Sequence, residues 1–155
     1  MSSTRRPWSP IPLILVALVG GLPGAGALLG INWYRLGRPE EGRRTILLFA
    51  ILTLVGATVL GWLNSRGQVG GVSPDSAGEG AGVLVAWQFG QIGIAAVEAL
   101  RQRGPFERFL AEENSPAGLG GFVAETVVAM AFAAIGGALI HGAIVRLAVR
   151  IFSGS

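Results

Sequence analysis

The sequence contains no cysteine and no lysine, and it has a single histidine and a single aspartate. The lack of cysteine excludes disulfide bonds, iron–sulfur clusters, thiolate zinc sites and thiol nucleophiles, and the lack of lysine excludes Schiff-base chemistry. Every serine lies outside the long apolar segments, so intramembrane hydrolysis by serine and histidine, or by paired aspartates, lacks its reagents. We therefore expect no enzymatic activity, no catalytic residue, and no bound cofactor or metal ion.

Charge is also scarce, because only 14% of the 155 residues are charged whereas 51% are hydrophobic. Four long apolar segments together hold just two charged residues, Glu98 and Glu125. The segments are residues 11–34, 45–63, 81–100 and 122–145. As helices they are long enough to cross a hydrocarbon core of about 30 Å. The sequence therefore predicts an all-α, polytopic membrane bundle of four transmembrane helices that forms a single transmembrane domain over residues 1–155.

The positive charge of the chain comes from 12 arginines, which stand mainly beside the apolar segments, against 9 acidic residues. Positive flanks on membrane helices explain this placement better than nucleic-acid binding. We expect a multi-pass protein of the cell membrane whose partners are the lipid bilayer and other membrane helices. Those helices would belong to a homo-oligomer or to a larger membrane complex, and nucleic acid is not an expected partner.

Small residues recur at four-residue spacing in the first and the fourth apolar segments. Such spacing removes bulk from one side of a helix and lets another backbone approach closely. We expect a kink near Pro23 and helix packing at these positions. The predicted packing residues are Gly20, Gly24, Gly26, Gly30, Ala133 and Gly137.

The connections between the apolar segments differ in character. Residues 64–80 are rich in glycine and serine, which predicts a flexible loop. Residues 105–113 begin with Pro105 and place Phe106, Phe109 and Leu110 on one face. That pattern predicts a short interfacial helix between the third and fourth transmembrane helices.

Polar residues follow one side of the third apolar segment, where Gln88, Gln91, Glu98 and Gln102 are spaced by three, seven and four residues. One interpretation is hydrogen bonding to neighbouring helices, and the other is a wet stripe that lines a cavity or an ion path. The candidate polar cluster comprises Gln88, Gln91, Glu98, Arg101, Glu125 and His141.

The orientation follows from the arginines if each apolar segment crosses the membrane. Connections after odd-numbered segments then share one side, which holds seven arginines, and the other side holds five. The positive-inside rule therefore predicts that both termini lie outside.

A resemblance is carried by the string from Asn32 to Glu40, in which Leu36, Gly37 and Arg38 follow a glycine-rich apolar run. It resembles small bacterial multi-spanning membrane proteins in which a glycine-rich first helix ends in an N-x-x-x-L-G-[R/K] segment. The resemblance covers about residues 12–63. That group has no established activity, so the resemblance implies an integral protein of the bacterial inner membrane and no site residue.

Two functions remain open from the sequence. The first is a non-enzymatic scaffold or accessory subunit that acts through helix–helix association, favoured by the small-residue spacing. The alternative is a small oligomeric transporter or channel that uses the polar stripe of the third helix. They differ in whether the polar residues converge on a water-filled cavity or on dry helix contacts.

Overall fold

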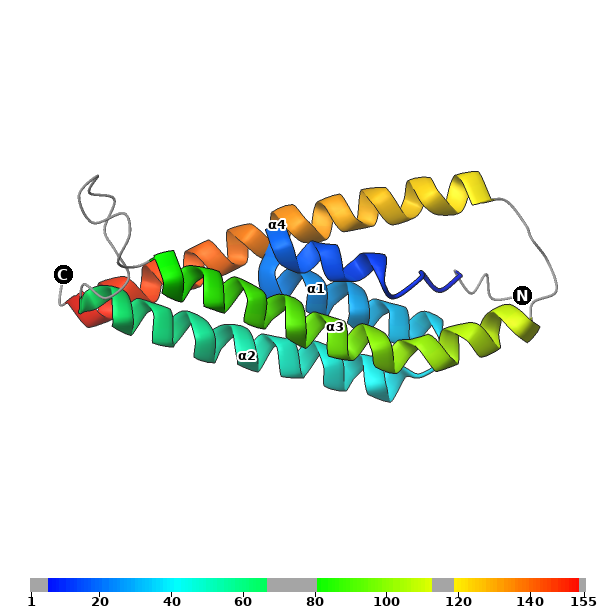
Figure 1. The fold of residues 1–155 in the computed structure, drawn as a ribbon, viewed down its shortest axis with the longest axis horizontal. Helices are drawn as coiled ribbons and strands as arrows, with labels where there is room; N and C mark the ends of the chain where they lie inside the picture. The colour runs from blue at the N-terminus through cyan, green and yellow to red at the C-terminus, as the bar shows by residue number, and fades with distance from the viewer. Residues whose placement is uncertain (1–5, 67–80, 113–118, 154–155) are drawn as a thin grey trace.

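The computed structural model describes residues 6–66, 81–112 and 119–153, and its regular elements there are all helical. The elements are a short 3₁₀ helix, η1 (Pro12–Leu15), and four α-helices: α1 (Val16–Arg35), α2 (Pro39–Ser65), α3 (Ala81–Glu112) and α4 (Leu119–Ser153). Figure 1 shows the four α-helices in one elongated bundle. The helical elements confirm the predicted all-α class, and in the described part of the chain four helical stretches are long and apolar enough to cross a membrane by length and composition.

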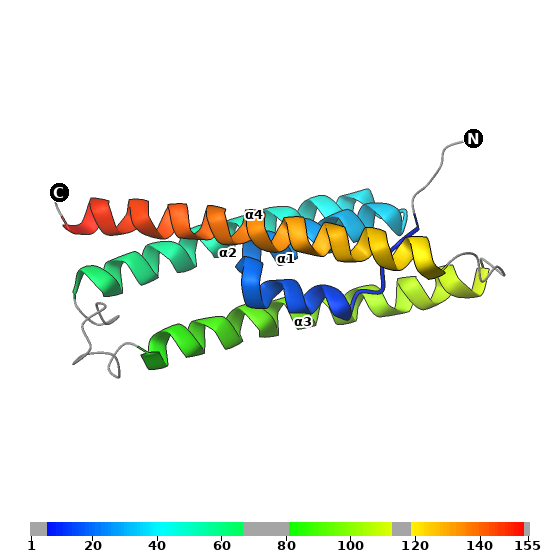
Figure 2. The same cartoon turned by 90° about the horizontal axis from the view of Figure 1, so that it is seen from above.

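The first long helix reverses its direction at Gly21. This residue has a φ of 58° and a ψ of −160°, and in Figures 1 and 2 the segments before and after it run side by side in opposite directions. We call residues 12–20 the entry arm, residues 22–35 the return arm, and the two together the hairpin. The break lies two residues before Pro23, because only glycine readily adopts this backbone conformation. Pro23 then stands in the first turn of the return arm, where its missing N–H is harmless.

Contacts at the base of the hairpin tie the residues that precede the entry arm to the end of the return arm. The backbone N–H of Trp8 donates to Asn32 Oδ1 at 2.6 Å, and Asn32 Nδ2 donates to the Trp8 carbonyl at 3.0 Å. Arg35 stacks 3.7 Å from the centre of the Trp8 ring and donates to the Arg6 carbonyl at 2.9 Å. Arg6, Trp8 and the end of α1 therefore lie at the same end of the bundle.

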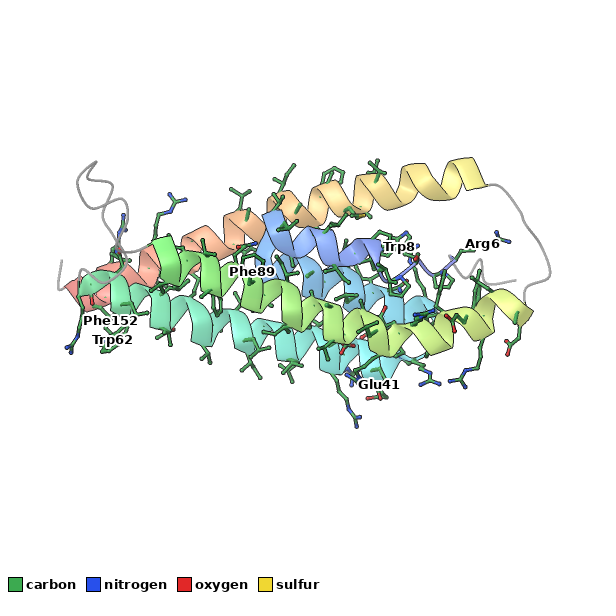
Figure 3. All side chains as sticks on the ribbon, viewed as in Figure 1. Arg6, Trp8, Glu41, Trp62, Phe89 and Phe152 are labelled. Carbon is green, nitrogen blue, oxygen red and sulfur yellow. The ribbon has the colours of Figure 1, made fainter. Side chains whose placement is uncertain are left out.

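The bundle thus has two distinct ends. Trp8 and Glu41 lie at the first, which we call the hairpin end, and Trp62 and Phe152 lie at the other, which we call the far end (Figure 3). The predicted orientation assumed that the segment over residues 11–34 carries the chain from one side to the other. The reversal contradicts that assumption, because hydropathy is the same for a straight helix and for two shorter helices folded together.

Small residues let the hairpin tip lie against the backbone of α4. A Cβ added to Gly20 would lie 2.8 Å from the Ala133 carbonyl oxygen, and one added to Gly137 would meet the backbone of both Gly20 and Gly24. Only glycine leaves room for this approach. Four of the predicted packing residues therefore meet at one contact between α1 and α4.

The return arm packs on α2 in the same manner. The side chain of Phe49 lies against Gly26, and that of Ile46 lies against Gly30. Phe49 is 1% exposed, and Leu22 and Leu29 are fully buried beside it. The hairpin is thus the centre of the bundle, with α2, α3 and α4 around it.

Two predicted connections differ from the structure. Residues 105–112 form the last turns of α3 rather than a separate helix, and the helix continues through Pro105. Arg103 donates to Glu107 at 2.7 Å, an i,i+4 pair that bridges the proline and supports the helix there. The predicted loop over residues 64–80 begins later, since α2 includes Ser65, and residues 67–80 and residue 113 lie outside the described residues.

Candidate functional site at the hairpin tip

A cavity of about 540 Å³ lies between the hairpin tip and the far end. It exists because the hairpin separates the surrounding helices along only part of their length. The α3 helix packs chiefly on η1 and α1 rather than on α2 or α4, so space remains beyond the tip. The cavity is lined by Val19, Gly21, Leu60, Asn64, Leu84, Trp87, Gln88, Gln91, Ala138, Gly142, Val145 and Arg146.

Two glutamines of α3 form the floor of the cavity and bind the broken ends of the hairpin. The N–H of Leu22, which begins the return arm, donates to Gln91 Oε1 at 3.0 Å. Gln88 Nε2 donates at 2.9 Å to the carbonyls of both Ala17 and Leu18, near the end of the entry arm. The amides also bind each other, with Gln91 Nε2 donating to Gln88 Oε1 at 3.2 Å.

These contacts follow from the needs of an interrupted helix. A break frees backbone N–H groups on one side and carbonyls on the other, and each is costly if buried without a partner. A glutamine amide has both a donor and an acceptor, so the pair serves both broken ends. The predicted polar stripe of α3 therefore stabilises a helix reversal, a role that the spacing of residues 88 and 91 did not reveal.

The far part of the cavity presents Asn64 from α2 and Arg146 from α4. Arg146 Nε donates to the Gly142 carbonyl of its own helix at 3.3 Å. Among the described lining residues, the polar side chains are those of Asn64, Trp87, Gln88, Gln91 and Arg146, and none of these residues carries a carboxylate. The cavity therefore combines apolar walls with hydrogen-bond donors at one end.

A second polar group lies nearer the hairpin end, around Glu98. This side chain is 4% exposed, and its Oε1 accepts hydrogen bonds from Trp33 Nε1 at 2.5 Å and Thr45 Oγ1 at 2.7 Å. Its Oε2 accepts from Arg101 at 2.8 Å, and Arg101 also pairs with Glu41 at 3.2 Å. The carboxylate thus joins α1, α2 and α3, and we call these five residues the Glu98 cluster.

Gln102 continues this polar side of α3 by one more turn. Its Nε2 donates to the Leu29 carbonyl at 2.8 Å, and its Oε1 accepts from Asn32 Nδ2 at 2.8 Å. Between the two polar levels lies Ala95, which is fully buried. Packed side chains therefore separate the cavity from the hairpin end, and a separate pocket of about 440 Å³ lies between α2 and α3 beside Glu98 and Arg101.

The structure divides the predicted polar cluster into two levels. Gln88 and Gln91 form the cavity floor, whereas Glu98 and Arg101 stand seven or more residues later on α3, about 10 Å further along the helix. Glu125 and His141 belong to α4, and their side chains lie outside the described residues. Asn32, Trp33 and Thr45 were not predicted as partners, since single polar residues in apolar segments do not reveal what they face.

Within the described residues, no group of three or more histidine, cysteine, aspartate or glutamate side chains is placed to hold a metal ion. Comparison of the chain with known protein families, with curated proteins and with solved structures finds no match. The geometry of the hairpin, the cavity and the two polar levels is therefore the basis for a functional assignment.

Proposed function

We propose that the protein is a multi-pass protein of a cell membrane, the bacterial inner membrane, in which α2, α3 and α4 cross the bilayer and α1 is re-entrant. In this role it is a small transporter or channel subunit, and the cavity at the hairpin tip is its solute site. Large apolar side chains project outward from α3 and α4, among them Phe89 at 70%, Phe132 at 74% and Leu139 at 65% exposure. A lipid environment would cover such a surface.

The observation that carries the proposal is a broken helix that ends at a cavity partway through the bundle. Lipid cannot hydrogen-bond a free backbone group, so an interrupted helix at membrane depth requires protein or water as its partner. Transporters place discontinuous helices at their solute sites for this reason. The Gly21 break likewise lies beside a cavity, of about 540 Å³, and its freed backbone groups are bound by Gln88 and Gln91.

The scaffold interpretation receives less support from the packing. It rests on the small-residue grooves and on the shortage of catalytic residue types, and the grooves at Gly20, Gly24 and Gly137 are filled inside this chain. A scaffold also has no use for a solute-sized space beyond a helix break. The Glu98 cluster closes the hairpin end, which supports assigning this conformation to a state that opens toward the far end.

The arginines support an orientation for this arrangement. Eight arginines of the described residues stand at the hairpin end: Arg6, Arg35, Arg38, Arg43, Arg44, Arg101, Arg103 and Arg108. Three stand at the far end: Arg66, Arg146 and Arg150. By the positive-inside rule the hairpin end is cytoplasmic, and the cavity opens toward the outside.

Thiol labelling tests the proposal directly, because the natural chain has no cysteine. Ala138→Cys introduces a thiol into the cavity lining, whereas Leu139→Cys introduces one at the same depth on the outer surface of α4 and is the matched control. A membrane-impermeant thiol reagent added on the far side should modify the Ala138→Cys variant and leave the Leu139→Cys variant unmodified. An Ala138→Cys variant that reacts no faster than the Leu139→Cys variant would contradict the proposal, because the cavity would then be no more accessible to water than the outer surface of α4.

A second cysteine variant distinguishes a transporter from a protein whose cavity opens on one side only. Ala99 is fully buried below the cavity floor, next to Glu98. A transporter opens its closed end during part of its cycle, so the Ala99→Cys variant should react slowly with the reagent supplied on the hairpin side. If the Ala99→Cys variant stays unreactive from both sides while the Ala138→Cys variant reacts, the cavity is solvated but the protein does not transport a solute.

A further inference from the structure

Among the described residues, the charged side chains near the cavity are all positive. The described residues of the far half include Arg66, Arg146 and Arg150, whereas the acidic residues with described side chains all stand in the hairpin half, from Glu40 to Glu112. Of these arginines, Arg146 alone lines the cavity. A cation entering the space would find no carboxylate among the described lining residues, and the Arg146 guanidinium would repel it.

Two side chains of the cavity lining, Arg146 and Asn64, have N–H groups that make no hydrogen bond to a described residue. The Arg146 side chain makes one hydrogen bond to a described residue, from Nε to the Gly142 carbonyl, and a guanidinium has five N–H groups. The Asn64 amide lines the same space from α2 and makes no side-chain hydrogen bond within the described part of the chain. A guanidinium fork matches the two oxygens of a carboxylate, and a nearby amide adds a third donor.

The remainder of the lining requires an apolar ligand body. Leu60, Leu84, Trp87 and Val145 form walls on three helices, and the volume of about 540 Å³ is that of a small-molecule site. At the floor, both N–H groups of the Gln88 amide are already used on the hairpin carbonyls. A sugar or another polyhydroxylated solute would therefore leave most of its hydroxyl groups without partners.

We infer that the cavity binds a small organic anion with an apolar body, whose acidic group is held by Arg146 and Asn64 and whose body lies between Trp87 and Val145. This inference rests on the proposed function, since it names the solute class of the same cavity. An anionic lipid headgroup with its chain offers the same chemistry as a free organic acid. Both sources would place a negative group at the mouth and hydrocarbon below it.

Benzoate binding to the full chain in phosphatidylcholine nanodiscs tests the inference. Calorimetric titration should give saturable binding that is at least tenfold tighter than that of benzyl alcohol or benzylamine, which have the same body without the negative charge. Arg146→Gln should weaken benzoate binding at least tenfold. Arg150→Gln removes a charge from the same end but not from the lining, so it should leave the affinity unchanged.

Ala138→Phe provides an independent variant, since it fills the cavity and keeps Arg146. It should abolish benzoate binding, which a purely surface attraction to arginine would not predict. Repeating the titration with phosphatidylglycerol in the nanodisc separates the sources: competition by this lipid identifies a lipid anion, and unchanged affinity identifies a soluble one. Both results support the anion site.

The inference is overturned if benzyl alcohol binds as tightly as benzoate, or if Arg146→Gln binds benzoate like the natural protein. Its failure is distinct from that of the proposed function. If benzoate binding depends on Arg146 but the Ala99→Cys variant never reacts, the anion site is supported and transport is contradicted. If the Ala99→Cys variant reacts but the protein does not bind benzoate, transport is supported and the anion site is contradicted.

Discussion

At the scale of single residues, the hairpin depends on Gly21, whose backbone conformation is essentially restricted to glycine. A Cβ at this position would also lie 2.7 Å from Gln91 Oε1, which binds the return arm. We expect Gly21→Ala to lower the free energy of unfolding by about 1–3 kcal/mol. Gly104→Ala is the control: an added Cβ there meets nothing within 4 Å, so stability should rise by up to about 1 kcal/mol. Unfolding in mixed detergent micelles measures both variants, and losses of equal size would contradict the reversal.

Glu98 is the second residue on which the bundle depends, because one buried carboxylate accepts hydrogen bonds from Trp33, Thr45 and Arg101. A glutamine has only one acceptor oxygen, so its NH₂ group would face one of these donors. Glu98→Gln should therefore lower the free energy of unfolding by about 1–3 kcal/mol, the cost of a buried group without its partner. Glu107→Gln removes an exposed ion pair with Arg103 and should cost less than about 1 kcal/mol. The same unfolding assay measures the free energy of unfolding of both variants. Equal stability of the two would count against a structural role for the Glu98 cluster.

At the scale of elements, the contact between α4 and the hairpin tip is made by backbone against backbone. Gly137 meets Gly20 and Gly24, whereas an added Cβ on its neighbour Gly136 has no atom within 4 Å. Gly137→Leu should force α4 away from the tip and reduce the stability of the bundle by more than Leu52→Ala does. Gly136→Leu should fold normally, which makes it the matched control. Similar unfolding midpoints for the two leucine variants would show that the tip does not need this close approach.

The elements also show what a sequence can and cannot predict. Length and composition predicted the apolar helices, and four-residue spacing predicted close packing at Gly20, Gly24 and Gly137. The reversal was missed because 24 apolar residues satisfy the hydropathy rule whether they form one helix or two, and the decisive signal is the φ of a single glycine. The side of α3 that carries Gln91 and Glu98 was predicted from helical periodicity, but periodicity does not say what a face contacts. Those contacts are made with the hairpin, so they could not be predicted without first predicting the hairpin.

At the scale of the whole molecule, the cavity and the hairpin have the same cause. A helix folded back on itself fills only part of the length of its neighbours, so α2, α3 and α4 surround packed polar contacts at one end and leave an open pocket at the other. The Glu98 cluster, which closes the hairpin end, and the glutamine floor belong to one face of α3. A movement of the hairpin relative to α3 would therefore change both levels together, which is the coupling that alternating access requires.

The proposed topology makes a prediction about the two ends of the bundle, because three crossing helices place the ends of a chain on opposite sides of a membrane and four place them on the same side. We expect Arg6 and its neighbours to be cytoplasmic and the end of α4, near Phe152, to be outside, since eight arginines of the described residues stand at the hairpin end. Green fluorescent protein fused before residue 1 should fluoresce, because it would stay in the cytoplasm. The same reporter fused after residue 155 would be exported and should stay dark. Alkaline phosphatase fused after residue 155 should be active, and fused after Arg38 it should be inactive. Fluorescence from both terminal fusions would mean that α1 crosses the bilayer, and the re-entrant hairpin, the cavity it leaves and the proposed solute site would then have to be abandoned together.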